Sequence, residues 1–131
     1  MTFQTAVPVL QVSNVAKSVR WYEEVLGFEA WTFPEEEPYS FALLSRDTCE
    51  LMLQLSRETP VSQGWAAYVR VTGSSLLDLA EQVRASVPLS REPERMPHCD
   101  VEFSVTDPDG HEIVLSERLD DEASVPSVKE G

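Results

Sequence analysis

The sequence predicts an α+β fold built from two tandem copies of one strand-helix-strand-strand-strand unit, and three observations support this. The segments VLQVSNVAKS (9–18) and YVRVTGSSLL (68–77) share one order of features: a strand, a polar pair, a helix cap and a helix. Apolar residues recur at helical spacing after each cap. Alternating apolar and polar residues indicate strands elsewhere. Each unit alone is too small to bury its sheet face well, so the two copies are expected to form a single domain together.

In the first copy, a β-branched and aliphatic run predicts a strand over 7–12. Asn14 is a suitable N-cap and Gly27 a suitable C-terminal residue for a helix over 15–26. A turn is expected at 34–38, where two prolines flank three glutamates. The remaining strands of this copy are expected at 28–33, 39–44 and 49–55.

The second copy follows a segment at 57–64 that has no clear periodicity and is interpreted as a linker. A strand is expected over 66–71, and Ser74 or Ser75 caps the next helix, with Asp78 placed to complete a capping box. A closing hairpin is expected from strands at 99–105 and 112–116. We therefore predict a single domain over 1–118, with module one at about 6–56 and module two at about 65–118. Residues 119–131 are acidic and rich in small side chains, and are predicted to be disordered.

Composition places the chain among ordinary globular proteins, since 42% of its 131 residues are hydrophobic and 25% are charged. No apolar run is long enough to cross a bilayer, and the first residues lack the features of a signal peptide. We therefore expect a cytoplasmic location. Cys49 and Cys99 allow at most one bridge, and both are expected to be buried or half-buried thiols.

The charge balance is strongly acidic, with ten Lys and Arg against 23 Asp and Glu, for a formal net charge of −13. Such a surface repels nucleic acid and anionic membranes, so neither is an expected partner. It suits cationic ligands, although a role in solubility is the simpler explanation and the one favoured by composition alone.

Three stretches together resemble the vicinal oxygen chelate superfamily, which includes glyoxalase I, extradiol dioxygenases and the bleomycin resistance proteins. They are VPVLQVSNVAKSVRWYEEVLGF (7–28), AAYVRVTG (66–73) and EFSVTDPDGHEIVLSE (102–117). The resemblance covers about residues 6–117. It implies paired βαβββ modules whose curved mixed sheets form a cup with the helices outside, and a homodimer. The fold hosts several activities, so function depends on the site.

Catalytic members of this superfamily usually hold a divalent metal on inward-facing strand positions. By resemblance these positions are Val7, Ala66 and Val114 here, and none of these side chains can coordinate a cation. Glu50 aligns with the one further carboxylate ligand of glyoxalase I. His98 and His111 lie in or beside predicted turns and are expected to be surface or hairpin residues. We therefore expect no metal and no cofactor.

Strand parity also defines the inward side chains that a metal-free cup offers to a ligand. Carboxylates, amides, a phenol and a thioether on one surface suit a cationic or amphipathic organic molecule. The bleomycin resistance proteins are the most similar named group, although their Trp-Gly-Arg is replaced here by Cys99-Asp100-Val101. The predicted ligand-binding residues are Gln11, Glu50, Met52, Gln54, Trp65, Tyr68, Arg70, Glu102, Ser104 and Glu112.

Three alternatives remain open at this point. A metal-dependent enzyme of the glyoxalase or dioxygenase type is possible if the site is rearranged around Glu50, Glu112 and His111. Metal-free general acid and base catalysis by clustered carboxylates is a second alternative. The third is structural, with Glu50, Glu102 and Glu112 as solvated carboxylates on an open sheet face.

Overall fold

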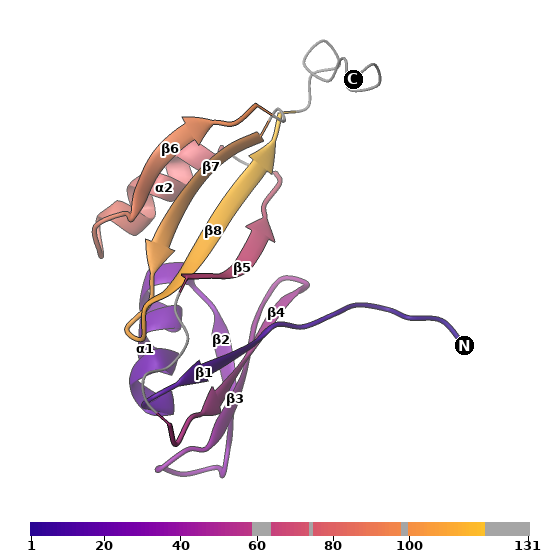
Figure 1. Ribbon diagram of the computed structural model, residues 1–131, viewed down its shortest axis with the longest axis vertical. Coiled ribbons are helices and arrows are strands. Elements are labelled where there is room, and N and C mark those ends of the chain that lie inside the picture. Colours follow the sequence, from indigo (N-terminus) through magenta and orange to yellow (C-terminus); the bar gives the residue numbers. More distant parts are fainter. Residues whose placement is uncertain (59–63, 74, 98–99, 120–131) are drawn as a thin grey trace. The chain divides into compact units, whose positions relative to one another are not determined.

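The computed structural model describes residues 1–58, 64–73, 75–97 and 100–119 (Figure 1). The described chain contains two copies of the same order of elements: a strand, a helix and three strands. The first copy comprises β1 (Val9–Val12), α1 (Val15–Leu26), β2 (Glu29–Phe33), β3 (Phe41–Arg46) and β4 (Cys49–Leu55). The second comprises β5 (Gly64–Arg70), α2 (Leu76–Arg84), β6 (Arg91–Arg95), β7 (Asp100–Thr106) and β8 (His111–Arg118).

The two copies form two four-stranded sheets with equivalent strand orders, β1-β4-β3-β2 and β5-β8-β7-β6. In each sheet the first strand of the module therefore lies beside the last. β1 pairs with β4 in parallel, whereas β2–β3 and β3–β4 are antiparallel, so the first sheet is mixed. The predicted α+β class with tandem βαβββ modules is confirmed.

The chain divides into two compact units, which are described separately below. The first unit comprises Met1–Ala66 together with Asp107–His111, the turn between β7 and β8. The second comprises Ala67–Thr106 and the described residues from Glu112 onward. The closing hairpin thus contributes its turn to one unit and its strands to the other.

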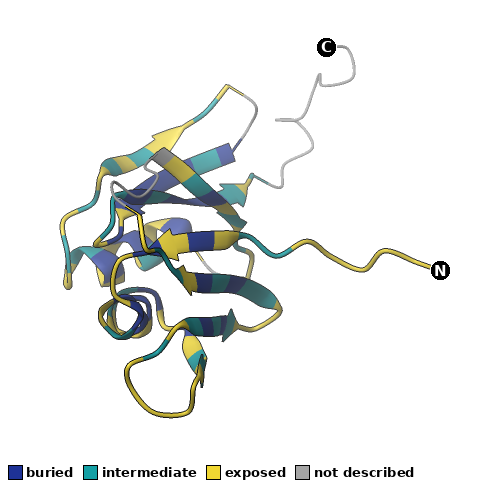
Figure 2. Cartoon of the chain, turned by 60° about the horizontal axis from the view of Figure 1, so that its bottom comes forward, coloured by how far each residue is buried: buried dark blue, intermediate teal, exposed yellow. Residues whose placement is uncertain are grey.

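Helix α1 has the bounds that the sequence predicts. The Asn14 side chain accepts a hydrogen bond from the Lys17 amide at 3.0 Å, and Gly27 ends the helix in the left-handed region at φ 71°. The helix packs on β2, β3 and β4 (Figure 1). Buried side chains alternate with less buried ones along β1, β3 and β4, which gives the sheet one apolar face toward α1 (Figure 2). The apolar core of this unit includes Val15, Val19, Tyr22, Leu26, Leu44, Leu51 and Leu53.

The Asp-Pro-Asp-Gly turn is held in the first unit by its buried carboxylate. Asp107 accepts hydrogen bonds from the Tyr22 hydroxyl at 2.7 Å and from the Asp109 and His111 amides at 2.9 Å. The carboxylate of Asp109 accepts the Ser13 amide at 3.1 Å. His111 was expected at the surface or in a hairpin; it begins β8 but is only 3% exposed, with its ring Nε2 2.7 Å from the Gln11 carbonyl oxygen. His111 therefore lies in the hairpin, as one of the two expected placements has it, and its ring is buried instead of lying at the surface.

In the second unit, Ser75 caps α2 by accepting the Leu77 amide at 3.1 Å. The capping box with Asp78 is absent, since the Asp78 amide donates to the Ser75 carbonyl oxygen. Ser74 lies outside the described residues, as do His98, Cys99 and most of the predicted tail. Helix α2 packs on β6 and β7, over a core that includes Leu76, Ala80, Val83, Phe103, Val105, Ile113 and Leu115.

Strand β6 was not anticipated, because its sequence Arg-Glu-Pro-Glu-Arg has neither apolar alternation nor β-branched residues. It is an edge strand, and its pairing with β7 shifts register between Arg91 and Glu94, around Pro93. Charge, proline and a register shift are features that suit an edge and exclude a central strand. None of the described helices is long and apolar enough to span a membrane.

The burial of Tyr22 leads us to expect that the folded protein loses stability at alkaline pH. Burial, followed by the nearby Asp107 carboxylate, raises the pKa of Tyr22 far above the ordinary phenol value. In the unfolded chain the phenol ionises near its ordinary pKa of about 10, so above that pH only the unfolded state loses this proton, and unfolding is favoured. We expect the urea midpoint of the wild type to fall more steeply above about pH 10 than that of Tyr22→Phe. Tyr39→Phe is the control, and equal pH dependence of wild type and Tyr22→Phe would contradict the assignment.

Candidate functional site

The face of the second sheet that lies opposite α2 is polar, and we call it the polar face. Strand alternation turns Phe103 and Val105 toward the core and leaves Glu102 and Ser104 on the other side of β7. The register places Glu102 opposite Ser116 and Ser104 opposite Val114, which is the parity expected from the sequence. The polar face comprises Tyr68, Arg70, Arg91, Asp100, Glu102, Ser104, Glu112, Ser116 and Arg118.

The Tyr68 hydroxyl is the centre of this face. It donates to the Glu102 carboxylate and lies 3.2 Å from Asp100 Oδ2 and 3.1 Å from Ser116 Oγ. Burial and the hydrogen bond with Glu102 raise the pKa of Tyr68, against an opposing effect of Ser116. The phenol is therefore a protonated donor at neutral pH, and its role here is to hold carboxylates in place.

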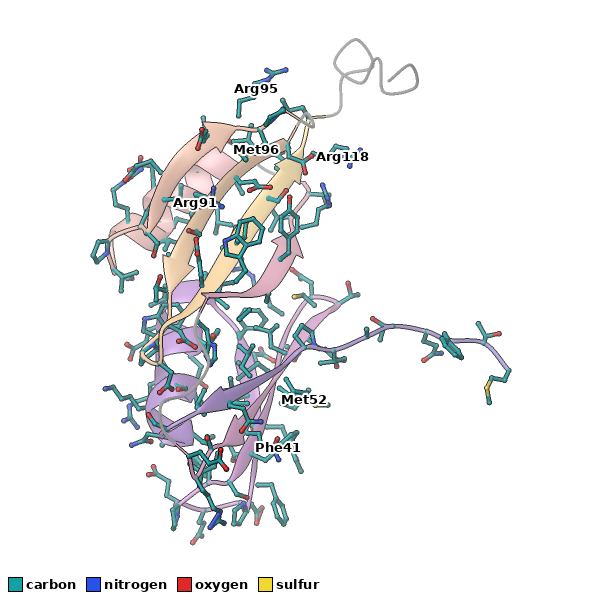
Figure 3. The ribbon with its side chains drawn as sticks, viewed as in Figure 1. Phe41, Met52, Arg91, Arg95, Met96 and Arg118 are labelled. Carbon is teal, nitrogen blue, oxygen red and sulfur yellow. The ribbon has the colours of Figure 1, made fainter. Side chains whose placement is uncertain are left out.

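Two glutamates on this face share one guanidinium group. Figure 3 labels Arg91 on β6. Its Nη2 lies 3.3 Å from Glu102 Oε1 and its Nε lies 3.4 Å from Glu112 Oε2. Ser104 fixes the second glutamate by donating to Glu112 Oε2 at 2.6 Å. Glu102 is only 1% exposed. The alternative of a solvated carboxylate is therefore wrong for Glu102, which is buried and multiply bonded.

Asp100, Arg91 and Arg118 belong to the polar face but were not predicted as site residues. Asp100 is fully buried, and Arg70 Nη1 lies 3.1 Å from its Oδ2 while Arg118 Nε lies 3.5 Å from its Oδ1. Asp100 has the same strand parity as Glu102, so alternation alone offered a signal for it. Strand alternation did not indicate Arg91, because this residue begins β6, the strand that the sequence pattern did not predict.

The first sheet has a different open face, which we call the apolar face. Cross-strand neighbours form one row of Val9, Met52, Leu43 and Trp31 and a second of Gln11, Gln54, Phe41 and Phe33. Trp31 and Phe33 are 60% and 57% exposed, and neither was among the predicted site residues. Gln11 Nε2 donates to Gln54 Oε1 at 3.0 Å, and Figure 3 shows Phe41 and Met52 on this sheet.

The predicted ligand-binding residues thus fall into two groups. Tyr68, Arg70, Glu102, Ser104 and Glu112 meet on the polar face of the second unit. The others lie in the first unit: Gln11, Met52 and Gln54 on the apolar face, Glu50 opposite Ser45, and Trp65 exposed in β5.

The donor groups do not fit a divalent metal ion. Among the described residues, no three or more His, Cys, Asp and Glu side chains are placed to hold one. The ring Nε2 of His111 is engaged by the Gln11 carbonyl, and successive positions in β8 turn His111 and Glu112 to opposite faces. Of the three ligand positions that the resemblance implies, Val7 precedes β1, Ala66 lies in β5 and Val114 in β8, and none of these side chains can coordinate.

The half-buried Cys49 is also a weak candidate for chemistry. Burial, and then the charges of Asp47 and Glu50, raise the pKa of its thiol, which keeps it in the unreactive protonated form at neutral pH.

The topology and the two open faces define the class of protein. The family model described as the glyoxalase/bleomycin resistance protein/dioxygenase superfamily matches residues 4–115, and the chain belongs to this superfamily. Comparison with curated proteins gives no match.

Solved structures share the fold at low identity. A glyoxalase-related enzyme from Clostridium phytofermentans is 17% identical with a TM-score of 0.75, over 91% of this chain and 98% of the other. A virulence protein from Salmonella typhimurium is 23% identical with a TM-score of 0.69, over 91% and 100%. TioX from Micromonospora sp. ML1 is 19% identical with a TM-score of 0.69, over 88% and 100%.

The donor set predicts the metal content. Because valine and alanine stand at the ligand positions, we expect protein purified without chelator to contain no stoichiometric Ni, Zn, Fe or Mn. Elemental analysis by mass spectrometry, before and after dialysis against EDTA, measures this. A tightly held metal at one equivalent per chain would contradict the prediction and revive the alternative around Glu50, Glu112 and His111.

Proposed function

We propose that the protein binds a cationic or amphipathic organic molecule reversibly and without altering it. The single observation that carries this proposal is the sharing of Arg91 by Glu102 and Glu112. Among the described side chains, these two carboxylates and one guanidinium carry one net negative charge, and Glu94 lies opposite Glu102 in the register and adds another. A ligand cation that joins or replaces Arg91 meets carboxylates that are already held in position.

Preorganisation supports binding at this place. Glu102 and Glu112 are fixed by hydroxyl donors, Tyr68 and Ser104, so little side-chain freedom is lost when a ligand binds. Tyr68 is 41% exposed, so part of its ring is accessible beside the carboxylates to a cationic or apolar group. The same bonding disfavours general acid and base catalysis, because Tyr68 stays protonated and the carboxylates are committed to hydrogen bonds and ion pairs.

A bleomycin-type antibiotic is our leading choice of ligand, in which case the protein would confer resistance by sequestration. The superfamily description includes bleomycin resistance proteins, and the resemblance to them implies a large cationic glycopeptide as the ligand. The excess of acidic residues in this chain favours its approach.

Calorimetric titration with metal-free bleomycin tests the proposal. We expect saturable binding at micromolar protein, weakened about tenfold or more by Glu112→Gln, because a hydrogen-bonded charge pair is lost. Glu102→Gln should have the same direction of effect, and circular dichroism checks its folding because Glu102 is buried. Glu24→Gln on the exposed side of α1 is the matched control. No heat with the wild type would remove the drug, and equal affinity of Glu112→Gln and Glu24→Gln would remove the site.

We further propose that the chain forms a homodimer through the apolar face of the first unit. Exposed Trp31, Phe33 and Val9 lie in adjoining cross-strand rows, which makes a continuous apolar surface. Monomeric proteins rarely leave such a surface open to water.

Sedimentation velocity tests this pairing. We expect the wild type at micromolar concentration to sediment as twice the chain mass of 14.7 kDa, and Trp31→Asp to sediment as a monomer. Leu77→Asp is the matched control, since Leu77 is similarly exposed at 56% but lies on α2. A monomeric wild type, or an unchanged Trp31→Asp dimer, would contradict the proposed interface.

A further inference from the structure

Arg70 and Arg118 gather on one buried carboxylate at the end of the polar face. Arg70 Nη1 lies 3.1 Å from Asp100 Oδ2, and Arg118 Nε lies 3.5 Å from Asp100 Oδ1. Asp100 is fully buried, whereas the arginine side chains are 42% and 54% exposed. The carboxylate is therefore enclosed while both guanidinium groups remain accessible to solvent.

The two arginines are positioned by more than charge. Arg118 is the direct cross-strand neighbour of Asp100 in the β7–β8 ladder. The Arg70 guanidinium carbon lies 5.6 Å from the centre of the Tyr68 ring, a cation–π contact. Asp100 is itself held by the Ser116 hydroxyl at 3.3 Å and lies 3.2 Å from the Tyr68 hydroxyl. These contacts hold the Arg70 guanidinium against Tyr68 and Asp100, and they place Arg118 beside the same carboxylate.

A purely structural ion pair does not explain the charge around Asp100. Two arginines face the single carboxylate of Asp100, whereas the described polar face as a whole has three arginines against three acids, so its positive charge is gathered at this end. The whole chain has only ten Lys and Arg, against 23 Asp and Glu. Positive charge at one end of the polar face is suited to binding an anionic group, and it is unusual in a protein this acidic. The planar guanidinium group of arginine matches the oxygens of carboxylates and phosphates.

The other part of the same face has the opposite sign, at Glu102 and Glu112 around Arg91. Asp100 and Glu102 are two residues apart on β7, about 7 Å between their Cα atoms, and the Tyr68 hydroxyl lies between their carboxylates. The polar face is therefore bipolar over the length of a small molecule.

We propose that Arg70 and Arg118 form an oxyanion subsite, and that the ligand of this face is a zwitterion. Its carboxylate or similar oxyanion binds the two guanidinium groups, and its ammonium or guanidinium group binds at Glu102 and Glu112. The cationic half of this assignment rests on the proposed function, whereas the oxyanion half rests on the arginine pair alone.

Three matched probes separate the two halves: 6-aminohexanoate carries both charges, hexanoate only the anion and hexylamine only the cation. Binding is measured by NMR titration of backbone amides and of the Arg118 side-chain N–H, at constant ionic strength. We expect 6-aminohexanoate to bind about tenfold or more tightly than either single-charge probe. Hexanoate should shift the Arg118 signal, and hexylamine should shift amides near Glu112.

Variants assign each half to its residues. Arg70→Gln and Arg118→Gln should abolish the hexanoate response and lower 6-aminohexanoate affinity to that of hexylamine. Arg118→Lys, which keeps the charge but not the fork, should give an intermediate loss. Arg84→Gln is the control, because Arg84 pairs with Glu81 and Glu92 outside the polar face. Thermal unfolding of each variant confirms that it is folded.

The outcomes distinguish this inference from the proposed function. If hexylamine binds as tightly as 6-aminohexanoate and the arginine variants change nothing, the oxyanion subsite is wrong and the cation site stands. If hexanoate binds through the arginines and hexylamine does not bind, the oxyanion subsite stands and the proposed cation site is wrong. If none of the probes shows saturable binding, both assignments fail.

Discussion

Burial of carboxylates on a sheet face is the constraint on which the polar face depends. An ionised carboxylate that leaves water must gain hydrogen bonds or counter-charges, because its desolvation is otherwise too costly. Asp100 and Glu102 are at most 1% exposed, and arginines from β5, β6 and β8 reach them. Tyr68 adds a neutral donor that contacts both acids. The arrangement of the polar face therefore follows from the burial of Asp100 and Glu102. Removing one of their arginine or tyrosine partners would leave a buried negative charge poorly compensated.

The two modules show how one topology serves different chemistry. Their sheets have equivalent strand orders and each carries its helix on one face. The apolar face of the first sheet carries the cross-strand row of Val9, Met52, Leu43 and Trp31. The polar face of the second sheet carries ion pairs between its strands. Strand alternation explains the difference, since open-face positions point away from the core beneath the helix and can carry a different chemistry in each sheet. Function on this fold is consequently a property of open-face residues, as expected for a fold that hosts several activities.

Local signals determined how much the sequence could predict. Helix α1 was predicted to the residue because Asn14 and Gly27 act through their own backbone neighbours. The repeat and the parity of β7 and β8 were also readable, and with them Glu102, Ser104 and Glu112. Strand β6 was not, because an edge strand needs neither alternation nor high β-propensity, and Arg91 was lost with it. The burial of His111 depends on a carbonyl 100 positions earlier in the chain, which no local pattern encodes.

The same balance of charges bears on affinity. The net charge of −13 describes the long-range attraction of cations, but the polar face itself is largely compensated by its own arginines. A cation that binds there gains only the difference between its own contacts and those of Arg91 that it displaces. The distances of 3.3 and 3.4 Å between Arg91 and its two glutamates are longer than those of strong charge-assisted hydrogen bonds, usually about 2.7–2.9 Å. The proposed ligand cation is therefore expected to compete with Arg91 only where it makes shorter contacts than Arg91 does with the two carboxylates.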